Sequence, residues 1–499
     1  MAKKAERIIQ IILDDVKADQ FFNLINAGKL PNFKKYFYDG IKSKVTGIYP
    51  AITIPARFTL LTGTYLDHYD IPGMHYYERE RNKIHNYASL HQWDAPKTLG
   101  GDAKTIYEQI SGNTVDLFSL MFRGASYYYP TKLQTISLYF WHFYLRKTDI
   151  SKANEFTVIK ILDIFNRPRH YFKNSDPPSF ISVWFFSTDD MLHNFGNDSV
   201  EYIDNLIHID KWLGHLIEGT NKRKGLKELG YFEDTVFIIS SDHGNYKAKK
   251  HVNLEPFFEK NGLIPIKSKK LGGNFDVAIG SVGQFYFLGK DKKSRPLINE
   301  MQNYGPQNID LFSTLFKIDG MKLMYYRDDY NNSEKGTIFI KYKENDKIYN
   351  GIIEYKGDKT RLVFDDKDFF GYSQDPKANK LLDNKFHTID EWLEHTHHLD
   401  FPMIVDQITR LFKNKNSCDI LCSTIGETIF NYEHGKTKNQ HIYGHDICTY
   451  EGVTCPLLIS GGNISEKNIQ FCKSADLVPT IVKLLNGNLA SSVIGKSLI

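Results

Sequence analysis

Short apolar runs recur along the chain between stretches with the spacing of amphipathic helices. The runs are Ile8 to Leu13, Phe180 to Phe186, Val236 to Ser240, Asp419 to Cys422 and Leu457 to Ser460. Runs that are apolar on both faces are typical of central strands in a parallel sheet that helices cover on both sides. The pattern therefore predicts an α/β fold with a mainly parallel central sheet.

The segment from Val200 to Thr220 predicts one of the covering helices. Its apolar residues recur at helical spacing, and only Asp210 interrupts the apolar face. Two other stretches break the alternation of strands and helices. Met74 to Pro178 contains aromatic and helical patches, and Gly336 to Phe364 alternates in strand fashion between turn residues.

These interruptions predict insertions into one domain rather than separate domains. We expect residues 1–73, 179–330 and 390–499 to form the core, residues 331–389 a small antiparallel β-ribbon, and residues 74–178 partly a cap and partly core. The aromatic stretch "SYYYPTKLQTISLYFWHFYL" within the first insertion is expected to cover the functional site, with a plain buried helix as the alternative. Substitution of Tyr127, Tyr128 or Trp141 should then change substrate preference.

Composition narrows the class of protein. The 499 residues are 41% hydrophobic and carry a formal net charge of +4, so nothing indicates a nucleic-acid duplex as partner. The apolar run at the N-terminus is too short for a signal peptide, and this segment is too acidic for one. No apolar run in the sequence is long enough to span a bilayer. Five cysteines indicate free thiols, so we expect a soluble, cytoplasmic protein.

Carboxylates and imidazoles follow the ends of several predicted strands. Asp14 and Asp15 follow the first, Asp189 and His193 the second, Asp242 and His243 the third, and His445 precedes the last. Each pair alone is more typical of a turn or a helix cap. Four strand ends that all supply such groups indicate a site for zinc-like divalent ions, because open α/β sheets collect their chemistry at this edge.

The stretch "YPAITIPARFTLLTG" places Thr53 at the start of a predicted helix, with Arg57 one turn later. Threonine is a good helix cap and proline suits the first turn, so a capped helix is one interpretation. The other is a nucleophile at a helix N-terminus, where amides and a cation can receive an anion.

In their order, "IILDDVKAD", "YPAITIPARFTLLTG", "TDDMLHNFG", "SSDHG" and "GHDICTYEGVTCPLLISGGNI" resemble motifs of the alkaline phosphatase superfamily, in particular its type I phosphodiesterase and nucleotide pyrophosphatase branch. The resemblance covers Ile8 to about Gly73, Ser179 to Gly289 and Phe401 to Ile499. It implies an alkaline-phosphatase-like three-layer sandwich and two divalent metal ions, zinc or alternatively manganese. It also implies that Thr53 attacks phosphorus and forms a phosphothreonine intermediate.

The resemblance assigns the ligands to two groups. Asp14, Thr53, Asp242 and His243 match positions around one ion, and Asp189, His193 and His445 match positions around the other. His441 and His434 are alternatives to His445. Asp15 is expected to be a cap or to support the ligands, whereas sulfatases use both aspartates of such a pair.

Three departures from the family pattern leave the substrate open. Ala56 stands where this branch usually has asparagine, "HYDIPG" replaces the usual His-Gly, and Thr53 with Arg57 forms Thr-x-Pro-x-Arg, which is similar to the Cys-x-Pro-x-Arg of sulfatases. The methyl group on the threonine Cβ closes the sulfatase route, which needs oxidation to an aldehyde, so we expect a phosphate ester.

The leading hypothesis is a metal-dependent phosphodiesterase or nucleotide pyrophosphatase that acts on a small phosphate ester, a nucleotide or a phospho-headgroup. A phosphomonoesterase or phosphoryl transferase with the same metal site is the second hypothesis. The third is a non-catalytic metal-binding protein whose insertions bind a partner. The physiological substrate and the oligomeric state stay open.

Overall fold

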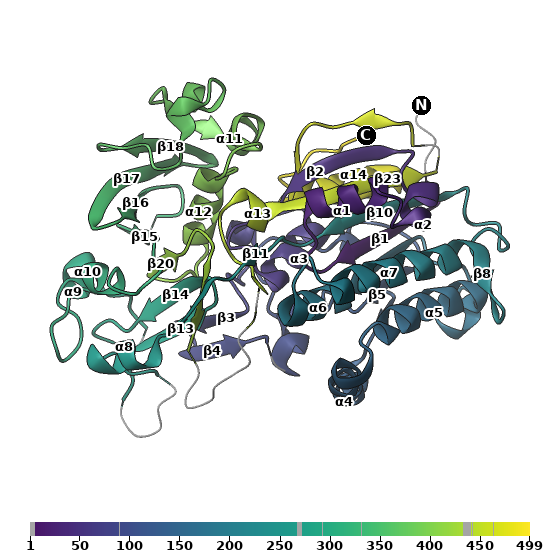
Figure 1. The fold of residues 1–499 in the computed structure, drawn as a ribbon, viewed down its shortest axis with the longest axis horizontal. Helices are drawn as coiled ribbons and strands as arrows, with labels where there is room; N and C mark the ends of the chain where they lie inside the picture. Colours follow the sequence, from purple (N-terminus) through teal and green to yellow (C-terminus); the bar gives the residue numbers. More distant parts are fainter. Residues whose placement is uncertain are drawn as a thin grey trace.

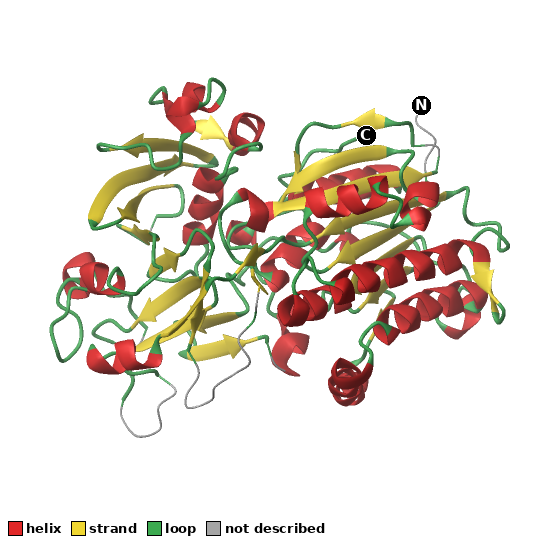
Figure 2. Cartoon of the chain, viewed as in Figure 1, coloured by secondary structure: helices red, strands yellow, loops and turns green. Residues whose placement is uncertain are grey.

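The computed structural model describes residues 5–88, 90–266, 272–291, 293–330, 332–432, 441, 443–462 and 464–499. The chain forms two lobes, one with a sheet between helices and one that consists mainly of strands (Figures 1 and 2).

The first lobe is built on a central sheet whose order is β24-β2-β23-β10-β1-β7-β5-β6, with β25 paired to β2. Its strands are β1 (Arg7–Leu13), β2 (Ile41–Thr46), β5 (Thr114–Leu117), β6 (Tyr127–Tyr129), β7 (Phe180–Phe185), β10 (Thr235–Ser241), β23 (Thr454–Gly461), β24 (Lys467–Asn468) and β25 (Cys472–Lys473). The strands from β10 to β6 pair in parallel, whereas β23 is antiparallel to both of its neighbours. The predicted, mainly parallel central sheet is therefore present.

Helices cover both faces of this sheet. Successive side chains of a strand point to opposite sides, so the apolar strand β1 contributes to a core on each face. Ile8 and Ile12 of β1 belong to one core, which includes residues of α3 and α14. Ile9 and Ile11 belong to a second core on the other face, which includes residues of α1, α5 and α7. Two cores on opposite faces of one sheet make a three-layer α/β sandwich.

The helices are α1 (Ala18–Asn26), α2 (Pro31–Tyr36), α3 (Thr53–Thr62), α4 (Lys132–Thr148), α5 (Lys152–Asn166), α6 (Ser187–Phe195), α7 (Val200–Glu218), α8 (Glu255–Lys260), α9 (Ile298–Met301), α10 (Leu311–Leu315), α11 (Ile389–Thr396), α12 (Ile404–Lys413), α13 (Tyr450–Val453) and α14 (Leu477–Leu484). The expected covering helix is α7. Its buried Asp210 accepts hydrogen bonds from the backbone amides of Asn32 and Phe33, so the polar interruption holds the start of α2. Among the described helices, none combines the length and the apolar character that a membrane span requires.

The second lobe contains a separate antiparallel sheet with the order β13-β14-β20-β15-β16-β17-β18-β19. Its strands are β13 (Phe275–Ile279), β14 (Val282–Phe287), β15 (Leu323–Arg327), β16 (Lys335–Glu344), β17 (Lys347–Lys356), β18 (Lys359–Phe364), β19 (His387–Thr388) and β20 (Ile420–Ser423). The prediction that Asp419 to Cys422 is a central strand of the parallel sheet is wrong. This run is apolar because β20 is buried between β14 and β15, and apolar character alone does not tell which sheet a strand joins.

The two expected insertions differ in how they join the rest of the chain. The strands β16 to β18 extend the second sheet, so they are not an isolated ribbon. Within residues 74–178, β5 and β6 complete the edge of the central sheet, and α4 and α5 follow them. The exact domain boundaries stay a prediction.

Four two-stranded sheets complete the strand inventory of the described ranges. They pair β3 (His75–Glu78) with β4 (Lys83–Asn86), β8 (Gly219–Thr220) with β9 (Arg223–Lys224), β11 (Tyr246–Lys247) with β22 (Tyr443–Gly444), and β12 (Lys250–Asn253) with β21 (Thr428–Asn431).

Candidate active site and metal centre

The register of three neighbouring parallel strands brings the predicted ligands to one edge of the sheet. Leu13, the last residue of β1, pairs with Ser241 of β10 and with Phe185 of β7. The next residues of β1 and β10 are Asp14 and Asp242, which therefore leave the sheet side by side. The amide of Asp15 donates a hydrogen bond to Asp242 Oδ1 at 3.2 Å, which ties the two strand ends together.

Asp14, Asp242 and His243 form the first group of candidate ligands, with one ligand atom from each lying within 4.8 Å of the others. All three side chains are buried. His243 Nε2 lies 3.7 Å from Asp14 Oδ1 and 3.7 Å from Asp242 Oδ2. The structure thus brings together the three residues that the sequence assigned to one ion.

Thr53 joins this group from the first turn of α3. Its Oγ1 lies 3.1 Å from His243 Nε2. The N-cap residue of α3 is Ile52, and Thr53 itself makes no side-chain capping hydrogen bond. The hydroxyl is therefore directed to the candidate metal group and not to the helix amides.

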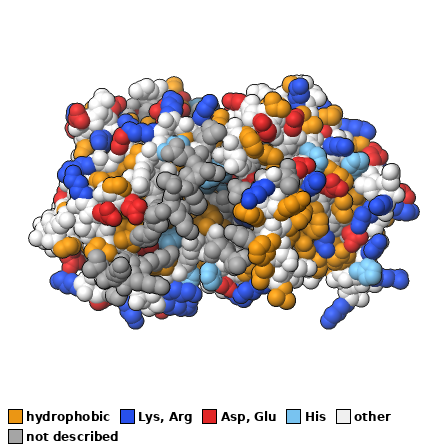
Figure 3. Space-filling view, turned by 60° about the horizontal axis from the view of Figure 1, so that its bottom comes forward, with side chains coloured by type: hydrophobic (Ala, Val, Ile, Leu, Met, Phe, Trp, Pro, Cys, Tyr) orange, Lys and Arg blue, Asp and Glu red, His pale blue; other side chains and the backbone are white. Residues whose placement is uncertain are grey.

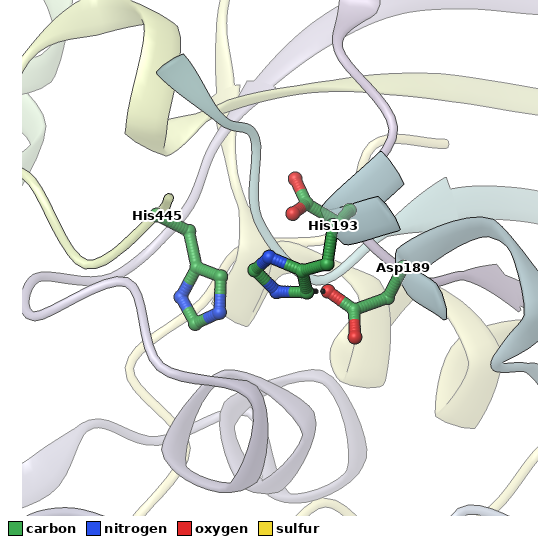
Figure 4. A group of neighbouring side chains, drawn as sticks. Asp189, His193 and His445 are labelled. Atoms are coloured by element: carbon green, nitrogen blue, oxygen red, sulfur yellow. Dashed lines mark ion pairs between the residues drawn. The ribbon is translucent and has the colours of Figure 1, made fainter. Parts of the chain in front are cut away.

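Asp15, Asp189, His193 and His445 form the second group, again within 4.8 Å of one another. Asp189 and His193 lie one turn apart on α6, and His193 Nε2 is 3.0 Å from Asp189 Oδ1. The other ring nitrogen of His193 bonds the carbonyl of Tyr443 at 2.9 Å, which fixes the orientation of the ring. Figure 4 shows the rings of His193 and His445 close together, with Asp189 beside His193.

Asp15 is the member of this group that the sequence did not assign as a ligand. It adopts a positive φ of 57°, and Asn245 Nδ2 donates to its Oδ1 at 2.9 Å. This uncommon backbone conformation turns the side chain of Asp15 toward the second group while Asp14 faces the first. The adjacent Asp14-Asp15 pair was the only signal in the sequence, and nothing in it predicts the left-handed turn.

The alternatives to His445 lie in different surroundings. The ring of His441 packs against His193 at a centroid distance of 4.4 Å, and the described His441 is not in either ligand group. The ring of His445 stacks on His243 at 4.3 Å and so connects the two groups. His434 lies outside the described residues. The geometry favours His445, although its role as a ligand stays a prediction.

Arg57 is buried beside the first group. Its guanidinium lies 3.4 Å above the ring centroid of Trp184, its Nη1 donates to the carbonyl of Ser119 at 3.3 Å, and its Nε is 3.8 Å from Asp242 Oδ2. The stacked aromatic ring and the fixed carbonyl hold the guanidinium plane in place. The sequence predicted the cation but not Trp184 as its support.

The packing of charges shifts the pKa of several side chains. Burial, together with the nearby charge of Asp242, raises the pKa of Asp14 well above its usual value. Burial works against a charged His243, but the negative charges of Asp242 and Asp15 outweigh it and raise the pKa of His243 to about 10. Clustered carboxylates that are buried with so few cations require a compensating positive charge.

Divalent cations fit this requirement. Asp14 Oδ1, Asp15 Oδ2 and Asp242 Oδ2 are buried and have no hydrogen-bond partner in the described part of the chain. Buried polar atoms without a partner are rare in folded proteins, and carboxylate oxygens with imidazole nitrogens are the ligands of zinc-like ions. The donor set and the unpaired atoms therefore both fit a pair of metal ions.

Two cavities adjoin the two groups. The first, of about 300 Å³, is lined by Asp14, Asp189, Trp141, His142, Trp184 and Phe186 among others. The second, of about 600 Å³, is lined by His193, His445, His75, Gly280, Ser281 and Tyr432 among others. The hairpin of β13 and β14 from the second lobe thus forms part of the site, which the sequence did not predict.

The expected aromatic cap is only partly present. Trp141 and His142 of α4 line the first cavity, and His142 Nε2 lies 2.5 Å from Asp190 Oδ2. Tyr127 and Tyr128 do not line it, because Tyr127 packs against Tyr171 and Tyr128 stacks on Phe122. Both tyrosines belong to the edge strand β6 and not to the wall of this cavity, so their expected effect on substrate preference stays a prediction.

Sequence comparison relates the chain to known proteins. Residues 8–320 match the family described as type I phosphodiesterase / nucleotide pyrophosphatase. Human ectonucleotide pyrophosphatase/phosphodiesterase family member 5 is 23% identical over 259 residues, which cover 51% of this chain and 49% of that protein. Member 3 from Mus musculus is 26% identical over 216 residues, 43% of this chain and 22% of that protein. The chain spans about half or less of the length of these curated relatives.

Structure comparison gives the same relationship. Murine ectonucleotide pyrophosphatase/phosphodiesterase 5 matches with a TM-score of 0.57 at 14% identity, over 97% of this chain and 96% of that chain. A further structure of the murine protein is an inactive threonine-to-alanine variant in complex with AMP. The likeness confirms the expected alkaline-phosphatase-like α/β fold. Because the family match covers most of the chain, this protein belongs to the type I phosphodiesterase / nucleotide pyrophosphatase family.

Proposed function

We propose that this protein is a metal-dependent phosphodiesterase of the nucleotide pyrophosphatase type with Thr53 as its nucleophile. The observation that carries the proposal is the position of the Thr53 hydroxyl, 3.1 Å from His243 and beside two groups of carboxylates and imidazoles that could each hold a metal ion. A helix cap would bond its hydroxyl to the amides of α3, and Thr53 does not.

Two divalent ions, zinc or alternatively manganese, would be held by the two ligand groups. The first ion would be bound by Asp14, Asp242 and His243 with Thr53, and the second by Asp189, His193 and His445, with Asp15 as an additional ligand. When bound, such ions polarise phosphoryl oxygens and lower the pKa of a nearby hydroxyl.

Residues of this chain supply the nucleophile and a positive charge that can pair with the phosphoryl oxygens. Thr53 Oγ1 forms the new bond to phosphorus as the bond to the first leaving group breaks, and water later releases the phosphoryl group from Thr53. Arg57 lies four residues further along α3, where its guanidinium can pair with the nonbridging phosphoryl oxygens. The N-terminus of α3 adds a positive dipole end on the same side.

The substrate is proposed to be a small phosphate ester, with a nucleotide as the first candidate. The murine relative whose structure contains AMP supports this class. The two cavities beside the ligand groups offer space for a substituent on either side of a phosphoryl group. We also propose that the protein works in a reducing compartment such as the cytoplasm, because all five cysteines are buried free thiols.

Turnover of two simple esters tests the proposal. We expect metal-dependent hydrolysis of bis-p-nitrophenyl phosphate with a higher kcat/KM than that of p-nitrophenyl phosphate. A preference for the monoester would support the phosphomonoesterase alternative, and no turnover of either ester by the metal-loaded protein would favour a non-catalytic role. Faster hydrolysis of p-nitrophenyl sulfate would contradict the choice of a phosphate ester.

A further inference from the structure

The helix α4 presents a continuous apolar stripe to solvent. Its members are Leu133, Ile136, Phe140, Phe143 and Tyr144, whose exposed fractions are 81%, 48%, 69%, 55% and 63%. The spacing of three and four residues places all five on one side of the helix. Figure 3 shows hydrophobic side chains gathered on the face of the molecule to which α4 belongs.

The opposite side of α4 is already occupied. Leu138 and Trp141 line the cavity beside Asp14 and Asp189, and Leu145 packs in a small core with Ile150. The inner side of α4 thus packs against the fold, whereas the outer stripe stays largely exposed to solvent. A contiguous patch of exposed large apolar residues marks a site that contacts another surface.

The charge of α4 indicates the nature of that surface. Its sequence contains Lys132, Arg146 and Lys147 and no aspartate or glutamate. Lys147 is exposed, and its Nζ lies 4.4 Å from the ring centroid of Phe143, so the ammonium accompanies the apolar stripe. Exposed aromatic and aliphatic residues on one face with basic residues beside them are typical of helices that lie in the interface of an anionic membrane.

The size of the stripe argues against a second copy of the chain. A large side chain has a surface of about 150–250 Å², so the exposed surface of the five side chains together is roughly 600 Å². A standard protein interface buries about 800 Å² on each partner and includes a larger polar rim. A single helical stripe with Lys132 and Lys147 near its two ends fits a lipid surface better.

We propose that the outer stripe of α4 docks this protein on an anionic lipid surface. Because the inner side of the same helix lines the first cavity, docking brings that cavity within about one helix diameter, ~10 Å, of the surface. The proposal does not depend on the catalytic role of Thr53.

Vesicle flotation of the full chain tests this proposal. We expect the wild type to float with vesicles of phosphatidylcholine mixed with phosphatidylserine, and less with phosphatidylcholine alone. The triple variant Leu133→Ser, Ile136→Ser, Phe143→Ser should lose at least ~10-fold in vesicle affinity. The double variant Lys132→Glu, Lys147→Glu should lose on the order of 10-fold on the anionic vesicles, and added salt should weaken the wild type.

The matched control is the double variant Leu297→Ser, Leu489→Ser, which removes exposed leucines away from α4 and should bind as the wild type does. Thermal melting checks that each variant is folded. Equal vesicle binding by the wild type and the triple variant would overturn the proposal, as would a wild type that stays with neither vesicle. A dimer that the triple variant abolishes, without vesicle binding, would assign the stripe to a second copy instead.

Discussion

Replacement of Arg57 by methionine removes the one cation that contacts the first ligand group among the described residues, while it keeps a long apolar side chain over Trp184. The Nε atom of Arg57 lies 3.8 Å from Asp242 Oδ2. At this distance two unit charges attract by about 4 kcal/mol at an effective dielectric constant of about 20. A phosphoryl group that develops negative charge near the same position would gain an interaction of this order.

We therefore expect Arg57→Met to lower kcat/KM for bis-p-nitrophenyl phosphate by about 10²- to 10³-fold, which corresponds to ~3–4 kcal/mol of lost transition-state stabilisation. Arg57→Lys keeps the charge but loses the planar stack and the fixed bond to Ser119, so its loss should be smaller. Metal content and thermal melting identify variants that have lost the site altogether. If Arg57→Met retained activity within about threefold of wild type with its metals bound, Arg57 would have only a structural role.

Three further outcomes follow from the same geometry. Trp141→Ala should raise KM for esters with large aromatic groups more than it affects a minimal methyl ester, as steady-state kinetics can measure, and equal losses on both would assign Trp141 to structure alone. A strong chelator should abolish activity and lower the melting temperature, because bound ions stabilise the folded state by up to about 4 kcal/mol at 1,000 times Kd; unchanged melting and activity would argue against a metal site. Burial raises the pKa of Asp116 to about 6 in the folded state, whereas the Asp116 carboxyl of the unfolded chain loses its proton near pH 4. The wild type should therefore lose up to ~3 kcal/mol of stability from this group as pH rises from about 4 to 6. Urea unfolding of Asp116→Asn should therefore show stability relative to wild type that increases over this pH range, and a pH-independent difference would refute the assignment.

The sequence contained enough information for the core of the fold because strands buried on both faces produce unmistakable apolar runs. The runs at β1, β7 and β10 were assigned correctly, and their parallel register brings Asp14 and Asp242 together. The run at β20 has the same local character but lies in the second sheet, since its environment is set by the distant strands β14 and β15. Which sheet receives a buried strand is a non-local property that a short window of sequence does not contain.

The candidate site shows the same division. The residues that follow strands were predictable, because chain geometry alone sends them to one edge of the sheet. Asp15 was not, since its position depends on a positive φ, and Trp184 was not, since its contact with Arg57 joins β7 to α3. Tyr127 and Trp141 lie in one aromatic stretch, yet Tyr127 belongs to the edge strand β6 and packs against Tyr171, whereas Trp141 lines the cavity. The aromatic composition of this stretch predicted a cap, but only the packing shows which of its residues line the cavity.

The measurement that tests the central claim most directly is the activity of Thr53→Ala with its metal content determined on the same sample. Removal of one hydroxyl leaves α3 intact, because Thr53 makes no capping hydrogen bond. If Thr53 is the nucleophile, kcat for bis-p-nitrophenyl phosphate should fall by ~10³-fold or more while both ions stay bound. Near-wild-type turnover by Thr53→Ala with both ions present would contradict the account.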